Sequence, residues 1–354
     1  MNVLVPDGGF AAHKSICEAE AVSLNNATTS LHTVSVCNEE LAEIQKYEGC
    51  IRDYFSRQNF KSACVAIGVF DGVHLGHQQV IKKMISEAKA HRAAPVVVTF
   101  DRHPKTVIPH SKPPLLIYSL KQKLKALADC GAQYVLLIPF DINFSRIEAA
   151  CFVKILNYEL GNIKSISVGR NFLFGHNRGG NVALLEEIGK KLGFTVFGLN
   201  PVSLDGKTIS STRVREAILK GEISIVSQML GRDYGVSGKV VPGDGIGKRL
   251  GFPTANIDVT GLVLPPRGVY ATRVAIDENL YNAVLNIGLR PTLRQPNPQL
   301  RFELHILDFN DNIYGKEIET IFVKKLRGEI QFSSIEQLKS QIKKDIEQAR
   351  EVLD

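Results

Sequence analysis

The spacing of apolar residues changes once along this chain, and this change restricts the possible fold more than any other feature. Over residues 61–199, short apolar runs alternate with segments whose apolar residues recur every three or four positions. That alternation is typical of a parallel sheet covered by helices on both faces. After Arg232, strands separated by Gly, Pro and Asn turns predict a small β-barrel. The expected fold class is therefore α/β, followed by a smaller β domain.

The same periodicity locates the elements. Strands of the sheet are expected at 64–70, 96–100, 134–138, 166–168 and 195–199, and strands of the barrel at 268–276, 281–287, 301–309 and 317–324. Gly131 and Gly193 follow two of the helices, where a left-handed C-cap favours glycine. Ser334 and Gln337 form a capping box that begins a long C-terminal helix.

The length of 354 residues exceeds what one hydrophobic core usually supports, so we expect two domains. The expected division is an N-terminal extension (1–60), the α/β domain (61–215), a linker helix (216–232) and the barrel domain (233–354). Residues at the start of the extension lack clear periodicity and resemble neither a secretory signal nor an Arg-rich transit peptide. We interpret the extension as poorly defined.

The composition limits the class of partner. Hydrophobic residues make up 44% and charged residues 22% of the chain, and no apolar run is long enough to span a bilayer, so we expect a soluble protein without a membrane partner. A net charge of +7 favours small anionic substrates but falls short of a nucleic-acid surface. We interpret Lys121, Lys123 and Lys125 as a solvated helix face.

The six cysteines are scattered and show no paired ligand spacing. This pattern favours a reducing cytoplasm and no zinc site.

The strongest local signal is GVFDGVHLGHQQVI at residues 68–81, which runs from a buried strand through a glycine-rich bend into a helix. Free N–H groups and the positive helix end bind phosphate at such a bend, and Gly72 and Gly76 let a nucleotide approach. His74 and His77 lie three residues apart and can neutralise charge on an α-phosphate while pyrophosphate leaves. Two alternatives are a simple strand-to-helix turn and half of a metal site, for which no third or fourth ligand is evident. Phe70 and Asp71 complete this candidate site.

Further polar segments are expected at the same carboxyl edge of the sheet, where open α/β folds bind ligands. VGRNFLFGHNRGGN (168–181) is a second glycine-rich loop, and its Arg178 can meet phosphate in a forked geometry. ISSTRVR (209–215) offers the hydroxyls of Ser210, Ser211 and Thr212, which can cap a helix or bind phosphate. TFDRHP (99–104) supplies another polar loop or is simply a strand end stopped by proline.

In the barrel, GDGIGKRLGFPTANI (243–257) combines a glycine loop with an extended segment. Thr254 and Asn256 alternate onto one side if the segment is extended, offering two neutral oxygen ligands to Mg²⁺ on ATP phosphates. It is not a Walker motif, because the GxxxxGK[ST] spacing is missing. The candidate ATP-binding residues of this loop are Gly243, Gly245, Gly247, Lys248 and Gly251.

Phosphorylation of an alcohol also needs a residue that orients and deprotonates the hydroxyl. RFELHILDF (301–309) offers Glu303 on a strand, although a lone Glu on a half-buried strand usually only faces solvent.

The segments GVFDGVHLGH, TFDRHP, VGRNFLFG and ISSTRVR, in this order, resemble the FMN adenylyltransferase module of the prokaryotic bifunctional riboflavin kinase/FAD synthetase family. The resemblance implies a Rossmann-like nucleotidyltransferase domain in which His74 and His77 contact ATP phosphates. It also implies that Asn171, commonly Asp in the family, lies near the nucleotide. Ser211, Thr212 and Arg215 are then expected to hold the triphosphate.

The segments GDGIGKRLGFPTANI, PPRGVYATRV, NIGLRPTL, FELHILDF, NIYGKEI and KLRGEIQF resemble the riboflavin kinase module of the same family. This implies a six-stranded flavin-binding barrel with Glu303 as catalytic base and with Thr254 and Asn256 around Mg²⁺. Lys248 stands where the family has Arg, so a point charge replaces a forked contact with phosphate.

The resemblance thus predicts a cytoplasmic enzyme that uses ATP to convert riboflavin to FMN and FMN to FAD. Two alternatives stay open: another nucleotidyltransferase of the same superfamily, and a regulator that binds flavin or nucleotide without turnover.

Overall fold

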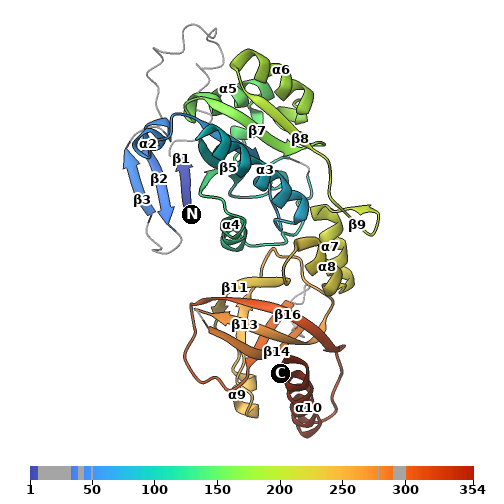
Figure 1. The fold of residues 1–354 in the computed structure, drawn as a ribbon. Coiled ribbons are helices and arrows are strands. Elements are labelled where there is room, and N and C mark those ends of the chain that lie inside the picture. The colour runs from blue at the N-terminus through green and yellow to red at the C-terminus, as the bar shows by residue number, and fades with distance from the viewer. Residues whose placement is uncertain (7–32, 39–43, 49–50, 110, 278, 290–299) are drawn as a thin grey trace. The chain divides into compact units, whose positions relative to one another are not determined.

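The computed structural model describes residues 1–6, 33–38, 44–48, 51–109, 111–277, 279–289 and 300–354. The chain folds into two compact units (Figure 1). Unit 1 comprises Met1–Pro114 and Lys123–Ile209, and unit 2 comprises Leu115–Gln122 and Ser210–Asp354.

Unit 1 is built on one large sheet whose described strands follow the order β3-β2-β1-β6-β5-β4-β7-β8. In that order the strands are β3 (Ile44–Glu48), β2 (Thr33–Asn38), β1 (Asn2–Pro6), β6 (Tyr134–Ile138), β5 (Ala94–Phe100), β4 (Ala63–Ile67), β7 (Ile163–Gly169) and β8 (Thr195–Leu199). Strands β1 and β4 to β8 pair in parallel, whereas β2 pairs antiparallel with both β1 and β3. The α/β prediction and the five predicted strands are confirmed.

Helices cover both faces of this sheet (Figure 1). All of β4 is buried, and because successive side chains of a strand point to opposite faces, both faces must be covered. The described helices are α2 (Ile51–Arg57), α3 (Leu75–His91), α4 (Leu120–Asp129), α5 (Ala149–Glu159) and α6 (Val182–Leu192), with single turns η3 (Pro104–Thr106), η4 (Phe144–Arg146) and η5 (His176–Arg178) and a hairpin of β9 (Ser203–Leu204) and β10 (Lys207–Thr208). Gly193 ends α6 in the left-handed conformation, as predicted.

The beginning of the chain contributes to the core of unit 1, which the sequence analysis did not anticipate. Strand β1 pairs in parallel with β6, and Leu4 is fully buried. Helix α2 adds Ile51 and Phe55 to the same core, where Phe55 meets the ring of Tyr134 edge-on. The expectation of a poorly defined extension otherwise falls largely on residues 7–32, 39–43 and 49–50, which lie outside the described residues.

The cysteines depart from expectation at one position. Cys151 is disulfide-bonded, whereas Cys64 carries a free thiol. Disulfide bonds are more typical of oxidising environments, so the cysteines no longer support the prediction of a reducing compartment.

Unit 2 is a closed antiparallel barrel, as predicted, with the strand order β11-β12-β15-β14-β13-β16. The strands are β11 (Gly235–Val241), β12 (Ala255–Asp258), β15 (Leu300–Ile306), β14 (Asn279–Leu289), β13 (Gly268–Ile276) and β16 (Glu317–Arg327). Helices α7 (Ser211–Lys220) and α8 (Ile223–Leu230) precede the barrel, and the short α9 (Ile246–Leu250) lies between β11 and β12. The interior is filled by aromatic rings, since Phe322 contacts Tyr234, Tyr270 and Phe302.

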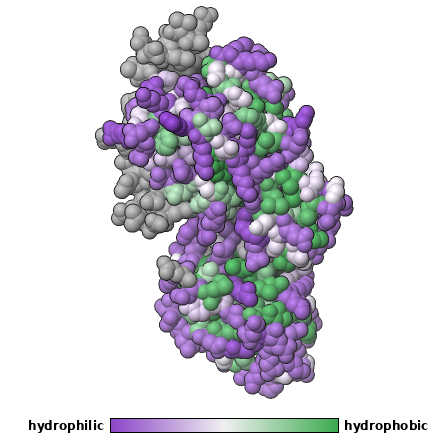
Figure 2. All heavy atoms as spheres, viewed as in Figure 1, coloured by the Kyte–Doolittle hydropathy of each residue, from purple (hydrophilic) through white to green (hydrophobic). Residues whose placement is uncertain are grey.

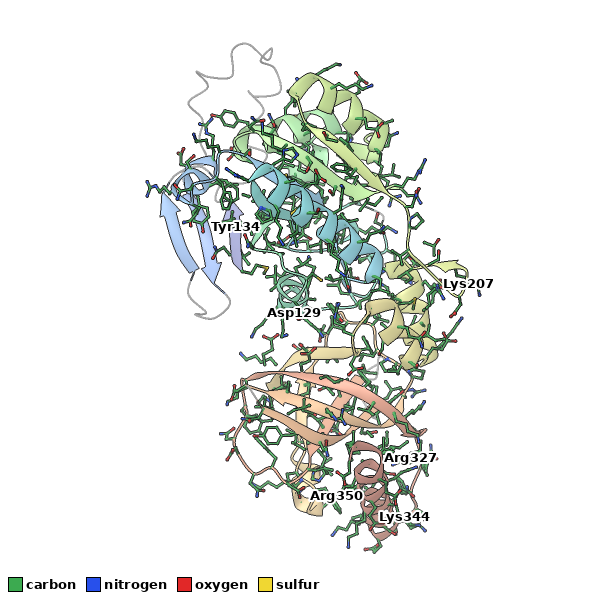
Figure 3. All side chains as sticks on the ribbon, viewed as in Figure 1. Asp129, Tyr134, Lys207, Arg327, Lys344 and Arg350 are labelled. Carbon is green, nitrogen blue, oxygen red and sulfur yellow. The ribbon has the colours of Figure 1, made fainter. Side chains whose placement is uncertain are left out.

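The long C-terminal helix α10 (Ile335–Leu353) packs against the outside of the barrel. Ser334 caps it by accepting a hydrogen bond from the N–H of Gln337. The Gln337 side chain accepts from the N–H of Ser333, not from that of Ser334, so only one half of the predicted capping box forms as expected. Arg327 of β16 holds the buried carboxylate of Asp345 through two hydrogen bonds (Figure 3).

The visible surface is largely hydrophilic, with smaller hydrophobic areas on both units (Figure 2). Among the helices that the structure describes, none combines the length and the apolar character needed to cross a bilayer.

We expect Leu4→Ala to destabilise unit 1 by about 3 kcal/mol, because it removes a fully buried side chain and leaves a cavity. Calorimetry of the full chain should show one transition lowered by roughly 6–12 °C. Val5→Ala is the matched control, since Val5 is only half-buried and points to the opposite face. Equal small effects of both changes would show that β1 is not part of the folded core.

Candidate active site

Unit 1 gathers three of the predicted segments at one edge of its sheet. Strands β5, β4 and β7 are adjacent and parallel, so their carboxyl ends lie side by side. The glycine bend follows β4, the TFDRHP turn follows β5, and the second glycine-rich loop follows β7. The prediction that these segments meet at the carboxyl edge is confirmed.

The backbone of the first bend is strained. Gly72 has a φ of 80°, and the two non-glycine residues Phe70 and Val73 have φ values of 53° and 40°. Side-chain-bearing residues with positive φ are rare and gather at functional sites, where the surrounding structure holds them in place. Asp71, between them, is buried.

The two predicted histidines lie together at the start of α3. His74 is the residue before the first turn and is only 5% exposed, and its ring stacks on that of His77 with centroids 3.7 Å apart. Phe70 packs edge-on against His77 at 5.2 Å. A Cβ on Gly76 would lie 3.2 Å from the His74 ring, so glycine at this position leaves room for the stacked pair. Both imidazoles therefore lie where the helix end favours an anion.

The loop after β7 is held close to α5. A Cβ on Gly175 or Gly180 would lie 2.6 Å from atoms of Ala149, so the loop passes directly over that residue. Asn171 and Arg178 are both exposed on this loop, and Arg178 has a φ of 57°. Their predicted contacts with nucleotide remain predictions.

The ISSTRVR segment crosses from one unit to the other. The carbonyl oxygen of Ile209, in unit 1, lies near Gly76, 4.0 Å from where a Cβ would be. Ser210 begins unit 2 and caps α7 by accepting a hydrogen bond from the N–H of Arg213. Ser211 and Thr212 form the first turn of that helix, and Arg215 Nε donates to the carbonyl of Leu115 at 2.8 Å. The capping interpretation of Ser210 is confirmed.

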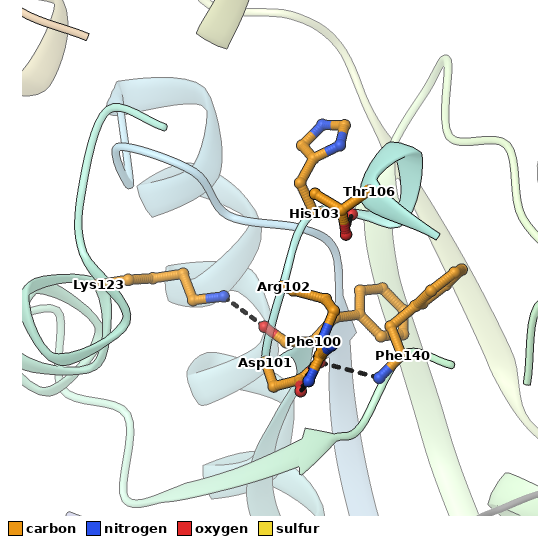
Figure 4. A network of polar contacts seen from close by, with 7 residues as sticks. All are labelled: Phe100, Asp101, Arg102, His103, Thr106, Lys123 and Phe140. Carbon is orange, nitrogen blue, oxygen red and sulfur yellow. Dashed lines mark hydrogen bonds and ion pairs between the residues drawn. The ribbon is translucent and has the colours of Figure 1, made fainter. Parts of the chain in front are cut away.

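A cation from α4 bonds to the TFDRHP turn, and its position was wrongly predicted from the sequence. Lys123 was expected on a solvated face with Lys121 and Lys125, but it is only 7% exposed and its amine donates to the carbonyl of Phe100 (Figure 4). That prediction is wrong for Lys123, because this residue lies three positions after Leu120 and four before Leu127, on the apolar side of α4. The helical spacing could have revealed it.

In unit 2, the candidate base belongs to a row of polar residues across three strands. Glu303 of β15 pairs with Asn256 of β12 on one side and with Asn286 of β14 on the other. Directly opposed residues share a face of a sheet, so all three point to the same side. The neighbours Phe302 and Leu304 are buried, so this row is on the outer face of the barrel. Asn286 was not predicted, although its place in the strand pairing makes it a neighbour of Glu303.

The glycine loop lies directly against the two predicted metal ligands. A Cβ on Gly243 would lie 1.9 Å from the amide nitrogen of Asn256, and one on Gly247 would lie 2.9 Å from the hydroxyl of Thr254. Between Gly245 and Gly251, both with positive φ, the loop forms the short helix α9, which carries the exposed Lys248. Only glycine permits these approaches.

Two further side chains surround Glu303. Arg301 lies two residues earlier on the same face, and its guanidinium bonds the carboxylate of Glu303 at 2.9 Å and also ion-pairs with Asp244 of the glycine loop. His305, two residues later, donates through Nδ1 to the carbonyl of Pro253 at 2.7 Å. Neither Arg301 nor His305 was predicted, although the two-residue period of a strand places both on the same face as Glu303.

Comparisons with known proteins separate the same two halves. Residues 56–213 match the family model described as FAD synthetase, and residues 230–353 match the model described as riboflavin kinase. A bifunctional riboflavin kinase/FMN adenylyltransferase of Escherichia coli (strain K12) is 36% identical over 293 residues, which is 82% of this chain and 93% of the relative. The protein of the same name in Bacillus subtilis (strain 168) is 34% identical over 80% of this chain and 90% of its own length.

The chain belongs to the bifunctional riboflavin kinase/FMN adenylyltransferase family. The resemblance identified in the sequence is thereby confirmed, and the histidine pair and the Glu303 row lie in different modules of this family. A solved structure titled "Crystal Structure of Macrolide-efflux Protein from Streptococcus pneumoniae" is 30% identical with a TM-score of 0.70, covering 82% of this chain and 94% of that chain.

We expect Gly243→Ala to lower riboflavin kinase activity about 100-fold, because the new methyl group displaces Asn256. FMN adenylylation by the same purified chain should not change. Gly245→Ala is the matched comparison in the same loop: its Cβ meets nothing within 4 Å, so it should cost less, mainly through its positive φ. Equal losses from the two changes would contradict the close packing of Gly243 on Asn256.

Proposed function

We propose that unit 2 transfers the γ-phosphoryl group of ATP to the ribityl hydroxyl of riboflavin, and that unit 1 joins the resulting FMN to the AMP moiety of ATP, releasing pyrophosphate. Membership of the bifunctional family supports both activities. The observation that carries the division of labour is the pair of glycine-lined bends, one beside a stacked histidine pair and the other beside a row containing a carboxylate.

In unit 1 the phosphate of FMN attacks the α-phosphorus of ATP, so no protein nucleophile is needed. The work left to the protein is alignment and neutralisation of charge. His74 and His77, at the helix start, donate to the phosphates as pyrophosphate leaves. Phe70, Asp71, Gly72 and Gly76 shape the bend, and Asn171 and Arg178 approach the nucleotide from the loop after β7. Ser210, Ser211, Thr212 and Arg215 lie in unit 2, and their contacts with the triphosphate remain predictions.

In unit 2 Glu303 accepts the proton of the attacking hydroxyl as the phosphoryl group is transferred. Gly243, Gly245, Gly247 and Gly251 supply a loop that wraps the phosphates, and Lys248 adds a point charge. Asn286, across the ladder from Glu303, is placed to orient the same hydroxyl through its amide.

The residues present fit Mg²⁺. Thr254 and Asn256 offer neutral oxygens, and Gly243 and Gly247, which lack side chains, let the loop lie directly against both residues. Mg²⁺ commonly keeps few protein ligands and completes its shell with phosphate oxygens and water. Among the described residues, no group of three or more His, Cys, Asp or Glu is placed to hold a metal ion. When bound, the ion would neutralise charge on the ATP phosphates.

Liquid chromatography of flavin products tests the function as a whole. The purified chain, given riboflavin, ATP and Mg²⁺, should form FMN and then FAD, and withholding Mg²⁺ should suppress FMN formation because the phosphate charge is no longer neutralised. With neither flavin product in the complete mixture, the flavin assignment would be rejected in favour of another nucleotidyltransferase. Flavin binding without turnover would indicate a regulator.

Substitutions in each unit test the division of labour. Glu303→Ala should lower FMN formation by about 100- to 10,000-fold and leave adenylylation of supplied FMN intact, whereas His77→Ala should do the reverse. Glu347→Ala on α10 and His91→Ala at the far end of α3 are exposed controls that should leave both steps unchanged. If either active-site change stopped both reactions equally, the assignment of one reaction to each unit would be wrong.

A further inference from the structure

Lys123 places a buried ammonium at the carboxyl edge of the sheet in unit 1. The side chain enters from the first turn of α4, and its Nζ donates to the carbonyl of Phe100 at 2.7 Å (Figure 4). The same Nζ lies 3.4 Å from the hydroxyl of Thr99. Lysine is almost never fully buried unless it is paired. Its partners here therefore indicate what it does.

Those partners connect the ends of three adjacent strands. The hydroxyl of Thr99 at the end of β5 donates to the carbonyl of Val69, just after β4, at 3.1 Å. The carboxylate of Asp101 accepts from the N–H of Phe140, just after β6, at 2.9 Å (Figure 4). Lys123 is thus bonded to the TFDRHP turn after β5, and hydrogen bonds connect this turn to the segments that follow β4 and β6.

The charges around Lys123 come from the same turns. Desolvation lowers the pKa of Lys123 to about 8, and the attraction of Asp71 and Asp101 opposes this shift. Asp101 also ion-pairs with Arg102 at 2.8 Å, so part of its charge is already balanced. Asp71 is buried within the glycine bend, three residues before His74. A buried carboxylate at this position would repel the phosphates of ATP unless a cation balances it.

We propose that Lys123 is a positioning residue for adenylyl transfer: its ammonium ties the TFDRHP turn to the glycine bend and offsets the charge of Asp71, so that ATP phosphates can lie beside His74 and His77. The proposal rests on the proposed function of unit 1 only in placing ATP at that bend. Lys123 itself does not contact the substrate; it acts through the two turns and through Asp71.

The first test is the pH dependence of the unmodified chain. Below pH 8 Lys123 carries its charge, and as the pH rises through its lowered pKa of about 8 the charge is lost. The kcat/KM of FMN adenylylation should therefore fall as the pH rises from 7 to 9.5, while riboflavin phosphorylation by the same chain follows a different profile. The charged groups that face Lys123 are the carboxylates of Asp71 and Asp101, and Asp101 is also paired with the guanidinium of Arg102. The absence of an alkaline fall specific to adenylylation would overturn the proposal.

The second test substitutes the amine. Lys123→Met keeps an unbranched side chain without charge, and at pH 7 it should lower kcat/KM for ATP in adenylylation about 100-fold and remove the fall between pH 7 and 9.5. Riboflavin phosphorylation should be retained. Lys125→Met is the matched control, because Lys125 is an exposed residue of the same helix that pairs with Asp129. It should keep normal adenylylation and its pH profile.

The third test separates positioning from a purely structural role. In the Lys123→Met background, Asp71→Asn should restore part of the lost affinity for ATP, because the charge that Lys123 offsets is removed. Strict additivity of the two changes, or loss of both activities in parallel with a lowered unfolding temperature, would show that Lys123 only supports the fold. Failure of the proposed function would give a different result, because the unmodified chain would then form no FAD at any pH.

Discussion

The site of unit 1 depends on one constraint: parallel strands buried on both faces can offer chemistry only beyond their ends. Every residue of β4 and β5 is buried, so no side chain within these strands can reach a substrate. The turns that follow them must therefore carry the functional groups, and the parallel pairing brings those turns to one edge. This accounts for the short length of the motifs and for their position immediately after apolar runs. It also accounts for the strained bend at Phe70 to Val73, where the chain must turn sharply and still begin α3 with the histidines in place.

The sequence predicted what is decided locally. The five predicted parallel strands, the Ser334 cap and the glycine-rich bends were all found where a strong apolar run or a turn residue marked them. Strand β1 was missed, because its place is fixed by pairing with β6, more than 120 residues away, and not by the local alternation of strands and helices. Lys123 was misassigned because it was grouped with Lys121 and Lys125 as a lysine cluster, without regard to the side of α4 on which each residue lies. The partners of Glu303 were missed for a related reason. Strand pairing places Asn286 of β14 beside Glu303 of β15, whereas the two residues are not neighbours in the sequence.

The glycines of the two candidate sites act in different ways. In unit 1 the glycines permit backbone conformations and leave space for imidazole rings, as Gly72 and Gly76 show. In unit 2 the glycines let one segment lie against another, since Gly243 and Gly247 touch the side chains of Asn256 and Thr254. A substitution at Gly243 is therefore expected to act through the displaced Asn256, whereas one at Gly72 would act mainly through backbone strain.

The packing of the barrel bears on where riboflavin binds. Tyr270, Phe302 and Phe322 fill the interior with contacting rings, as expected for a small barrel whose inside has room only for side chains. A flavin ring cannot enter such a core without unfolding it. Glu303 points outward instead, between Asn256 and Asn286, and the glycine loop reaches the same face through the ion pair of Asp244 with Arg301. These contacts favour an outer-face site, in which the loop proposed to bind ATP lies beside Glu303. Movement of that loop would then alter the surroundings of the base, because Arg301 bonds to both.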